Sequence, residues 1–121
     1  MYGKELILDL HKCDEGKFTR DSIERYFKLL CELIDMKRCE FYFWDDVGVP
    51  DEEKQSLLHT TGTSAIQFIL TSNITIHTLD LLRKAFINIF SCKDFDTEAA
   101  RDFTVSWFDG ELAAETIVER I

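Results

Sequence analysis

The sequence predicts an α+β two-layer sandwich, in which an antiparallel β-sheet carries two helices packed on one face. Two observations support this fold class. Short segments with alternating apolar residues recur along the chain, and two longer segments have apolar residues at helical spacing. The predicted order is β-α-β-β-β-α-β, which is typical of a sheet with its helices gathered in one layer. At 121 residues and 45% hydrophobic, residues 1–121 fit one domain, which can bury about two thirds of its unfolded surface.

The first half of the chain predicts two strands and a helix. Residues 4–10, "KELILDL", and residues 39–45, "CEFYFWD", have the composition and alternation of strands. Between them, the pattern of residues 18–36 predicts an amphipathic helix. Asp21 is the expected N-cap, and Glu24, three positions later, would complete a capping box. Residues 46–62 contain the only proline and predict a long acidic loop or a short helical insertion. The apolar positions of the helix are Ile23, Tyr26, Phe27, Leu30, Leu33 and Ile34.

The stretch "GTSAIQFILTSNITIHT", residues 62–78, holds two apolar runs separated by Thr71, Ser72 and Asn73. A turn between two strands explains this break, because Ser and Asn side chains bond their own backbone and tolerate turn geometry. The alternative is that Ser72 is a reactive group. Residues 83–92 predict another strand, residues 96–108 a second helix that begins near Asp96 or Thr97, and residues 115–121 a last strand.

Charge and cysteine content limit the possible functions. The formal net charge of -9 disfavours binding to nucleic acid or to an anionic membrane. No run approaches the about 18 apolar residues of a membrane span, and the N-terminus lacks the apolar region of a signal peptide, so we expect a cytoplasmic protein. The four cysteines form no C-x-x-C pair, which indicates reduced thiols. His11 and Cys13 could supply two zinc ligands, but no second pair of ligands matches them in the sequence.

Both faces of the predicted strands are apolar. The segments "AIQFILT" and "AFINIF" carry apolar side chains at successive positions, and two helices cover only one face of the sheet. An exposed apolar sheet face would exceed the patch that soluble monomers tolerate. We therefore expect a homodimer in which a second copy covers this face.

The segment "ILTSNITIHT", followed by "FINIFSC" with Cys92 fifteen residues after His77, resembles the prokaryotic S-adenosylmethionine decarboxylase family. That family has the form I-x-E-S-H-x-T-I-H-T and then an F-T-C-G strand. The opening "GKELILDLHKCD" is similar to the family's N-terminal strand. The resemblance runs from about Gly3 to the second helix and needs no gap between Ser64 and Cys92.

The resemblance implies self-cleavage between Thr71 and Ser72, after which Ser72 becomes a pyruvoyl cofactor. It also implies that His77 helps to remove a proton during cleavage, that Ser64 assists processing, and that Cys92 returns a proton to the substrate carbon. The small-molecule substrate would be S-adenosylmethionine, in the biosynthesis of spermidine and other polyamines. Taken singly, each of these residue types is more often structural, whereas their joint spacing favours the family.

The sequence departs from the family around this motif. Thr71 and Asn73 replace a Glu and a His, and Leu79 and Leu81 replace the aromatic and carboxylate that the family offers to the adenosyl group. Leucine cannot stack on a purine as an aromatic ring does, nor accept a hydrogen bond. Phe41, Phe43 and Trp44 on the neighbouring strand are further candidates, which would compensate for this loss in substrate binding.

Two functions from different classes therefore remain open. One is a pyruvoyl-dependent decarboxylase, acting on S-adenosylmethionine or on another amino acid. The alternative is an unprocessed, inactive relative that keeps the fold for binding or regulation.

Overall fold

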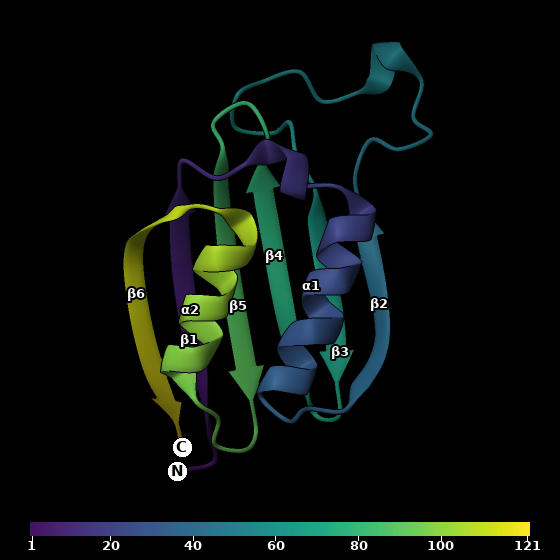
Figure 1. The fold of residues 1–121 in the computed structure, drawn as a ribbon. Helices are drawn as coiled ribbons and strands as arrows, with labels where there is room; N and C mark the ends of the chain where they lie inside the picture. Colours follow the sequence, from purple (N-terminus) through teal and green to yellow (C-terminus); the bar gives the residue numbers. More distant parts are fainter.

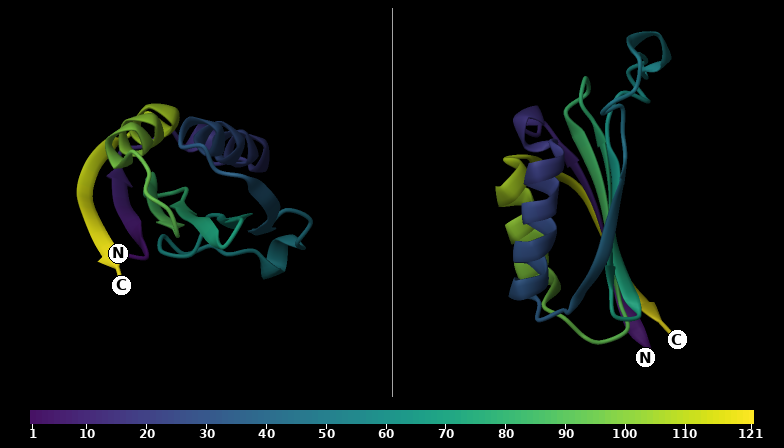
Figure 2. Two further views of the ribbon diagram at one scale, coloured as in Figure 1. Left: turned by 90° about the horizontal axis from the view of Figure 1, so that it is seen from below. Right: turned by 90° about the vertical axis from the view of Figure 1, so that its right-hand side faces the viewer.

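The computed structural model describes residues 1–121 as a six-stranded antiparallel sheet with two helices on one face, which confirms the predicted fold class (Figure 1; Figure 2). The strand order is β2-β3-β4-β5-β1-β6, so β2 and β6 are the edges. Neither helix is both long and apolar enough to cross a membrane. The elements are β1 (Gly3–His11), α1 (Arg20–Leu33), β2 (Arg38–Trp44), β3 (Ser64–Ile69), β4 (Ser72–Leu79), β5 (Lys84–Ser91), α2 (Thr97–Phe108) and β6 (Glu111–Arg120), with short 3-10 helices η1 (Glu15–Lys17) and η2 (Asp51–Glu53).

Three details of the prediction are corrected by the structure. The predicted order counts three strands between the helices, whereas the structure has four: the runs before and after Thr71 are separate strands, as the turn between them predicts, and β2 and β5 flank them. The cap of α1 is Thr19, whose hydroxyl accepts from Ser22 N–H at 3.2 Å, so no capping box begins at Asp21. The last strand begins at Glu111, earlier than predicted, because β6 pairs with the whole length of β1.

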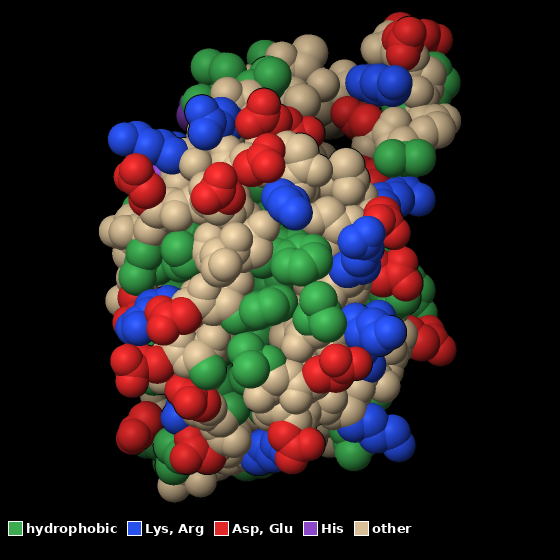
Figure 3. All heavy atoms as spheres, in the orientation of Figure 1, with side chains coloured by type: hydrophobic (Ala, Val, Ile, Leu, Met, Phe, Trp, Pro, Cys, Tyr) green, Lys and Arg blue, Asp and Glu red, His purple; other side chains and the backbone are tan.

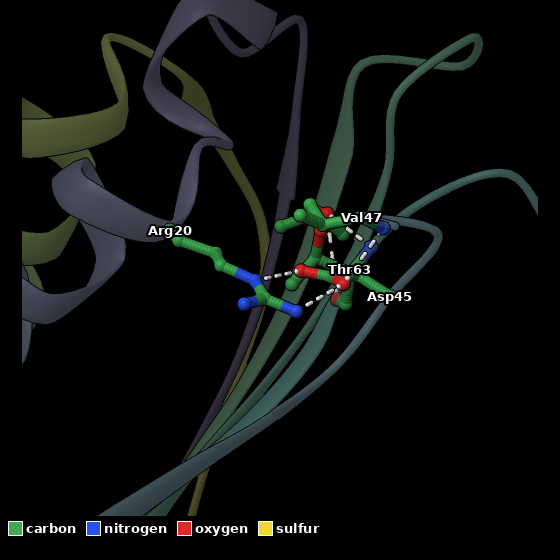
Figure 4. Close-up of polar contacts among 5 residues, drawn as sticks. Arg20, Asp45, Val47 and Thr63 are labelled. Carbon is green, nitrogen blue, oxygen red and sulfur yellow. Dashed lines mark hydrogen bonds and ion pairs between the residues drawn. The ribbon is translucent and has the colours of Figure 1, made fainter. Parts of the chain in front are cut away.

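The acidic segment between β2 and β3 is a loop that contains only the three-residue η2 (Figure 1; Figure 2). It extends beyond the end of the sheet. Its start is fixed by Arg20, whose Nε and Nη2 donate to the two carboxylate oxygens of Asp45 at 2.6 and 2.7 Å (Figure 4). The Arg20 guanidinium holds the pKa of Asp45 below its usual range. This bidentate ion pair joins the loop to the first residue of α1.

The core lies between the sheet and the helices. Strands β1 and β5 alternate buried and part-exposed residues, and the buried ones face the helices. Figure 3 shows a strip of hydrophobic side chains between the two helices, flanked by charged side chains. The fully buried residues with the largest side chains are Tyr26, Phe27, Phe108, Leu6, Leu8, Leu10, Ile23, Leu30, Ile74, Ile76, Ile87 and Ile89.

The opposite face of the sheet, which we call the open face, has no layer over it (Figure 2). Trp44 is 84% exposed, and Tyr42 packs edge-on against Phe68 with ring centroids 6.3 Å apart. Phe86 and Phe90 of β5 are only half-buried on the same face. The open face is therefore rich in apolar side chains, as the sequence predicts, and the homodimer stays a prediction.

A buried polar link holds the two helices together. Thr104 of α2 donates its hydroxyl hydrogen to the carbonyl of Ala100 at 2.7 Å, so the Tyr26 hydroxyl of α1 must donate to Thr104 Oγ1, also at 2.7 Å. The Tyr26 ring stacks on Phe103 at 5.9 Å. Tyr26 and Thr104 are both fully buried, so neither hydroxyl has water as an alternative partner.

The link predicts unequal effects for two conservative substitutions. Tyr26→Phe leaves the Thr104 hydroxyl bonded to Ala100 and should lower the free energy of unfolding by about 0.5–1.5 kcal/mol. Thr104→Val leaves a buried Tyr26 hydroxyl without a partner and should cost about 1–3 kcal/mol. Urea unfolding of the two variants measures the difference. An equal or smaller loss for Thr104→Val would show that Tyr26 has another partner.

Candidate active site

The turn between β3 and β4 places Ser72 at a bend of the backbone. Thr71 has a φ of 57°, in the left-handed region that a β-branched residue rarely adopts, and Ser72 is the first residue of β4. Strain of this kind persists only when the surrounding structure imposes it, and it is concentrated at functional sites. The peptide bond between Thr71 and Ser72 therefore directly follows a strained residue.

Ser72 and Cys92 lie together at this end of the sheet. The pairing of Asn73 with Phe90 aligns β4 with β5, which brings the residue after β5 beside the first residue of β4. The Cys92 N–H donates to Ser72 Oγ at 2.9 Å, and Cys92 Sγ lies 2.9 Å from Thr71 Oγ1. Ser72 is only 6% exposed, whereas Cys92 is partly exposed. The hydroxyl of Thr71, and then that of Ser72, lower the pKa of the Cys92 thiol.

Ser64 and His77 form a second pair. They face each other in the register between β3 and β4, and Ser64 Oγ lies 2.8 Å from His77 Nδ1. His77 is exposed on the open face. The structure therefore brings these two predicted residues into direct hydrogen-bond contact.

The two pairs are separated within one chain. Ser72 and His77 are five residues apart on β4, and alternation along a strand puts residues at odd spacing on opposite faces. Ser72 is buried on the helix side, whereas His77 is exposed on the open side. Five residues of extended strand also span about 17 Å. A single chain thus does not assemble all four predicted residues into one site.

Each pair borders its own hollow in the surface. The Ser72 hollow has a volume of about 390 Å³, and Lys37, Lys93 and Asp35 are its charged residues. The Ser64 hollow, of about 280 Å³, is lined mainly by apolar side chains, including Tyr42, Trp44 and Ile66. The first hollow is thus polar at its rim, and the second is largely apolar.

The candidate substrate residues lie apart from Ser72. Phe41 and Phe43 pack against the core and contact each other edge-on at 5.7 Å. Leu79 lines a hollow of about 340 Å³ together with Ser64 and His77, whereas Leu81 is exposed in the turn after β4. Their role in binding stays a prediction.

Tyr42 and Trp44 line the hollow beside Ser64 and His77 on the open face, and Phe86 of β5 is paired with His77 in the register. The alternation of residues 39–45 divides the aromatic residues into two sets, Phe41 with Phe43 and Tyr42 with Trp44. It does not say which set faces the helices. The sequence-based choice of Phe41, Phe43 and Trp44 therefore includes two residues that line the hollow beside His77, Phe43 and Trp44, and misses Tyr42.

A larger hollow, of about 650 Å³, lies between the start of α1 and the loop after β2, next to the ion pair of Arg20 and Asp45 (Figure 4). None of the predicted site residues lines it. No group of three His, Cys, Asp or Glu side chains in the structure is placed to hold a metal ion.

Two comparisons with known proteins bear on this geometry. A family model described as S-adenosylmethionine decarboxylase matches residues 4–120. Among solved structures, the crystal structure of the adenosylmethionine decarboxylase from Aquifex aeolicus VF5 is similar, with a TM-score of 0.75 and 16% sequence identity over 98% of this chain and 90% of that chain. At this identity the likeness shows a shared fold. No curated protein matches the sequence.

Three of the four cysteines, Cys13, Cys31 and Cys92, should differ in reactivity. Burial raises the pKa of Cys13 and of Cys31 to about 11, whereas the pKa of partly exposed Cys92 is lowered. Iodoacetamide at neutral pH should therefore alkylate Cys92 quickly, and Cys13 and Cys31 only after unfolding. Peptide mass spectrometry of briefly treated protein measures this order. Equal labelling of Cys92 and the buried pair in the folded protein would contradict the geometry described above.

Proposed function

The chain belongs to the S-adenosylmethionine decarboxylase family, and we propose that it cleaves itself between Thr71 and Ser72 and then acts as a pyruvoyl-dependent decarboxylase. The observation that carries the proposal is the position of Ser72. Its hydroxyl follows a strained peptide unit and is held by the N–H of Cys92 at 2.9 Å. A constrained bend of this kind favours attack on the adjacent carbonyl.

The acyl shift that begins self-cleavage requires only groups of one chain. Ser72 Oγ attacks the carbonyl carbon of Thr71, and the acyl group moves from nitrogen to oxygen to give an ester. Removal of the α-hydrogen of Ser72 then expels the Thr71 carboxylate, which becomes the new C-terminus, and hydrolysis by water releases the Ser72 nitrogen as ammonia and leaves the pyruvoyl group. The side chain of Thr71 is not consumed, so the Glu of the family is not required for the acyl shift.

The residues around Ser72 fit the pyruvoyl group that the family implies. The group would form from Ser72 at the first residue of β4, next to Cys92. When present, a pyruvoyl group supplies a ketone that accepts the electrons released as carbon dioxide leaves a substrate amino acid. Cys92 is partly exposed and lines the same hollow, which supports the proposal that its thiol returns a proton to the substrate carbon.

The second pair requires another copy of the chain. Ser64 and His77 lie on the open face, away from Ser72 of the same chain. We propose a homodimer in which two open faces pack together. The Ser72 side chain faces the helices, but the Thr71–Ser72 bond itself lies at the turn that ends the strands, so His77 of the partner subunit would approach this bond from the open face and complete the processing site. The apolar character of the open face supports this arrangement, since face-to-face sheets bury such side chains. A two-fold axis perpendicular to the strands would place the Ser72 end of one sheet against the His77 end of the other.

The family indicates the substrate, but two residues of this chain differ from those that the family offers to the adenosyl group. We propose S-adenosylmethionine as substrate, in cytoplasmic polyamine biosynthesis. Leu79 and Leu81, however, provide neither an aromatic face nor an acceptor for an adenosyl group. This departure favours two second candidates: decarboxylation of another amino acid, and an uncut relative with a binding or regulatory role.

Replacing Ser72 tests the cleavage. Wild-type protein should give two fragments, residues 1–71 and residues 72–121, in an intact-mass spectrum. Ser72→Ala should give one chain with an unchanged fold, because only a hydroxyl at the turn is lost. The control Ser56→Ala, in the exposed loop, should be cut like the wild type.

Either of two results would contradict the proposal. Two fragments from Ser72→Ala would show that another residue is the nucleophile. A single uncut wild-type chain, after prolonged incubation, would favour the binding or regulatory role.

A further inference from the structure

Ser72 must lose its hydroxyl proton when it attacks the Thr71 carbonyl, and the structure restricts which group takes that proton. A serine hydroxyl is a weak nucleophile until a neighbouring base accepts its hydrogen. His77 of the same chain lies on the opposite face of β4, about 17 Å away along the strand. Cys92 is the residue with an ionisable side chain that contacts both Thr71 and Ser72: its sulfur lies 2.9 Å from Thr71 Oγ1, and its backbone N–H donates to Ser72 Oγ.

We propose that the Cys92 thiolate is the base that accepts the Ser72 hydroxyl proton during self-cleavage, and that Thr71 is a positioning residue for this thiolate. The inference rests on the proposed self-cleavage and adds a role for Cys92 before any substrate binds.

The proposed step balances without any added reagent. The hydroxyl proton moves from Ser72 Oγ to Cys92 Sγ while a bond forms between Oγ and the Thr71 carbonyl carbon. The bond from that carbon to the Ser72 nitrogen then breaks. The nitrogen takes the proton back from the Cys92 thiol and becomes a free amine. The product is an ester, the thiolate is regenerated, and nothing is oxidised or reduced.

Two contacts place Cys92 for this role. Its N–H donates to Ser72 Oγ at 2.9 Å, which fixes the hydroxyl beside the residue whose sulfur would receive the proton. Its sulfur lies 2.9 Å from Thr71 Oγ1, and that hydroxyl also lies 2.7 Å from the carbonyl of Leu70. The Thr71 hydroxyl can therefore donate to Leu70 when Cys92 is a thiol and to the sulfur when Cys92 is a thiolate.

The charges around the hollow favour a thiolate. Lys93 follows Cys92 directly, and Lys37 lines the same hollow. The negatively charged residue of the hollow is Asp35, which forms an ion pair with Lys93. On the neighbouring strand, Lys4 pairs with Asp94. Hydrogen bonds from Thr71 and Ser72 and the charge of Lys93 all lower the pKa of Cys92. The thiolate is therefore populated at lower pH than in an unperturbed cysteine.

The test follows cleavage of freshly translated protein over time. Cys92→Ala should slow cleavage roughly 10²–10⁴-fold, the usual contribution of a general base. Cys92→Ser keeps the size and hydrogen bonding of the side chain and should also be slow, because a hydroxyl ionises only at much higher pH. Cys39→Ala, at the exposed cysteine of β2, should cut at the wild-type rate.

Hydroxylamine locates the step at which each variant stops, because it cleaves esters and leaves amides intact. His77→Ala should accumulate the ester, so hydroxylamine should release fragments 1–71 and 72–121. Cys92→Ala should not form the ester and should stay whole. Release of fragments from Cys92→Ala as fast as from His77→Ala, or unassisted cleavage of Cys92→Ala at the wild-type rate, would overturn the inference.

The pH profile tests the positioning role of Thr71. The wild-type rate should rise with pH and level off once the thiol has ionised. Thr71→Val keeps the shape of the residue but removes its hydroxyl, so the rise should move to higher pH, while Thr71→Ser should restore the wild-type profile. An unmoved profile in Thr71→Val would contradict the positioning role. If the wild-type chain is never cut, self-cleavage itself is refuted. If wild type and Cys92→Ala are cut at the same rate, self-cleavage stands and only the role of Cys92 is refuted.

Discussion

Side chains alternate between the two faces of β4, and this constraint determines where chemistry can occur. Ser72 is buried on the side of the helices, while His77, five residues later, is exposed on the open face. Shifting the register by one residue would exchange the two faces and expose Ile74 and Ile76 in place of their neighbours. Because those isoleucines belong to the core, the alternation is fixed, and the separation of Ser72 from His77 is fixed with it.

The same packing explains how a strained turn is kept. Thr71 adopts a left-handed conformation that costs about 1–3 kcal/mol in residues of its kind. The strands on both sides are held by antiparallel pairing and by a core that the helices complete. The hydrogen bond from Cys92 to Ser72 ties the turn to the end of β5. Fold stability and the reactivity proposed for the bond between Thr71 and Ser72 thus depend on the same contacts.

The sequence predicts the fold class well, because amphipathic periods are local properties of the chain. Alternation locates the strands, and helical spacing locates α1 and α2. It misses the Thr19 cap, since Thr19 and Asp21 are both residues that cap helices. The spacing of Ser64, Ser72, His77 and Cys92 predicts the family correctly.

The arrangement of the site is less accessible to sequence reasoning. The odd spacing between Ser72 and His77 on one strand is a local signal for opposite faces, whereas the resemblance assigns each residue a role and gives no position in space. Two contacts depend on the register between strands, which no local pattern contains: Ser64 with His77, and Ser72 with Cys92. The side of β2 that carries Tyr42 and Trp44 likewise depends on how the helices cover the sheet.

The central claim is that residues of two copies together form the processing site, and mixing two inactive variants tests it most directly. Ser72→Ala and His77→Ala chains are produced together, and each is also produced separately as an uncut control. The account predicts that only His77→Ala chains are cut in the mixture, at about half of their number, because a heterodimer contains one complete site. A mixture in which both chains stay whole, or a His77→Ala chain that cuts fully without a partner, would contradict it.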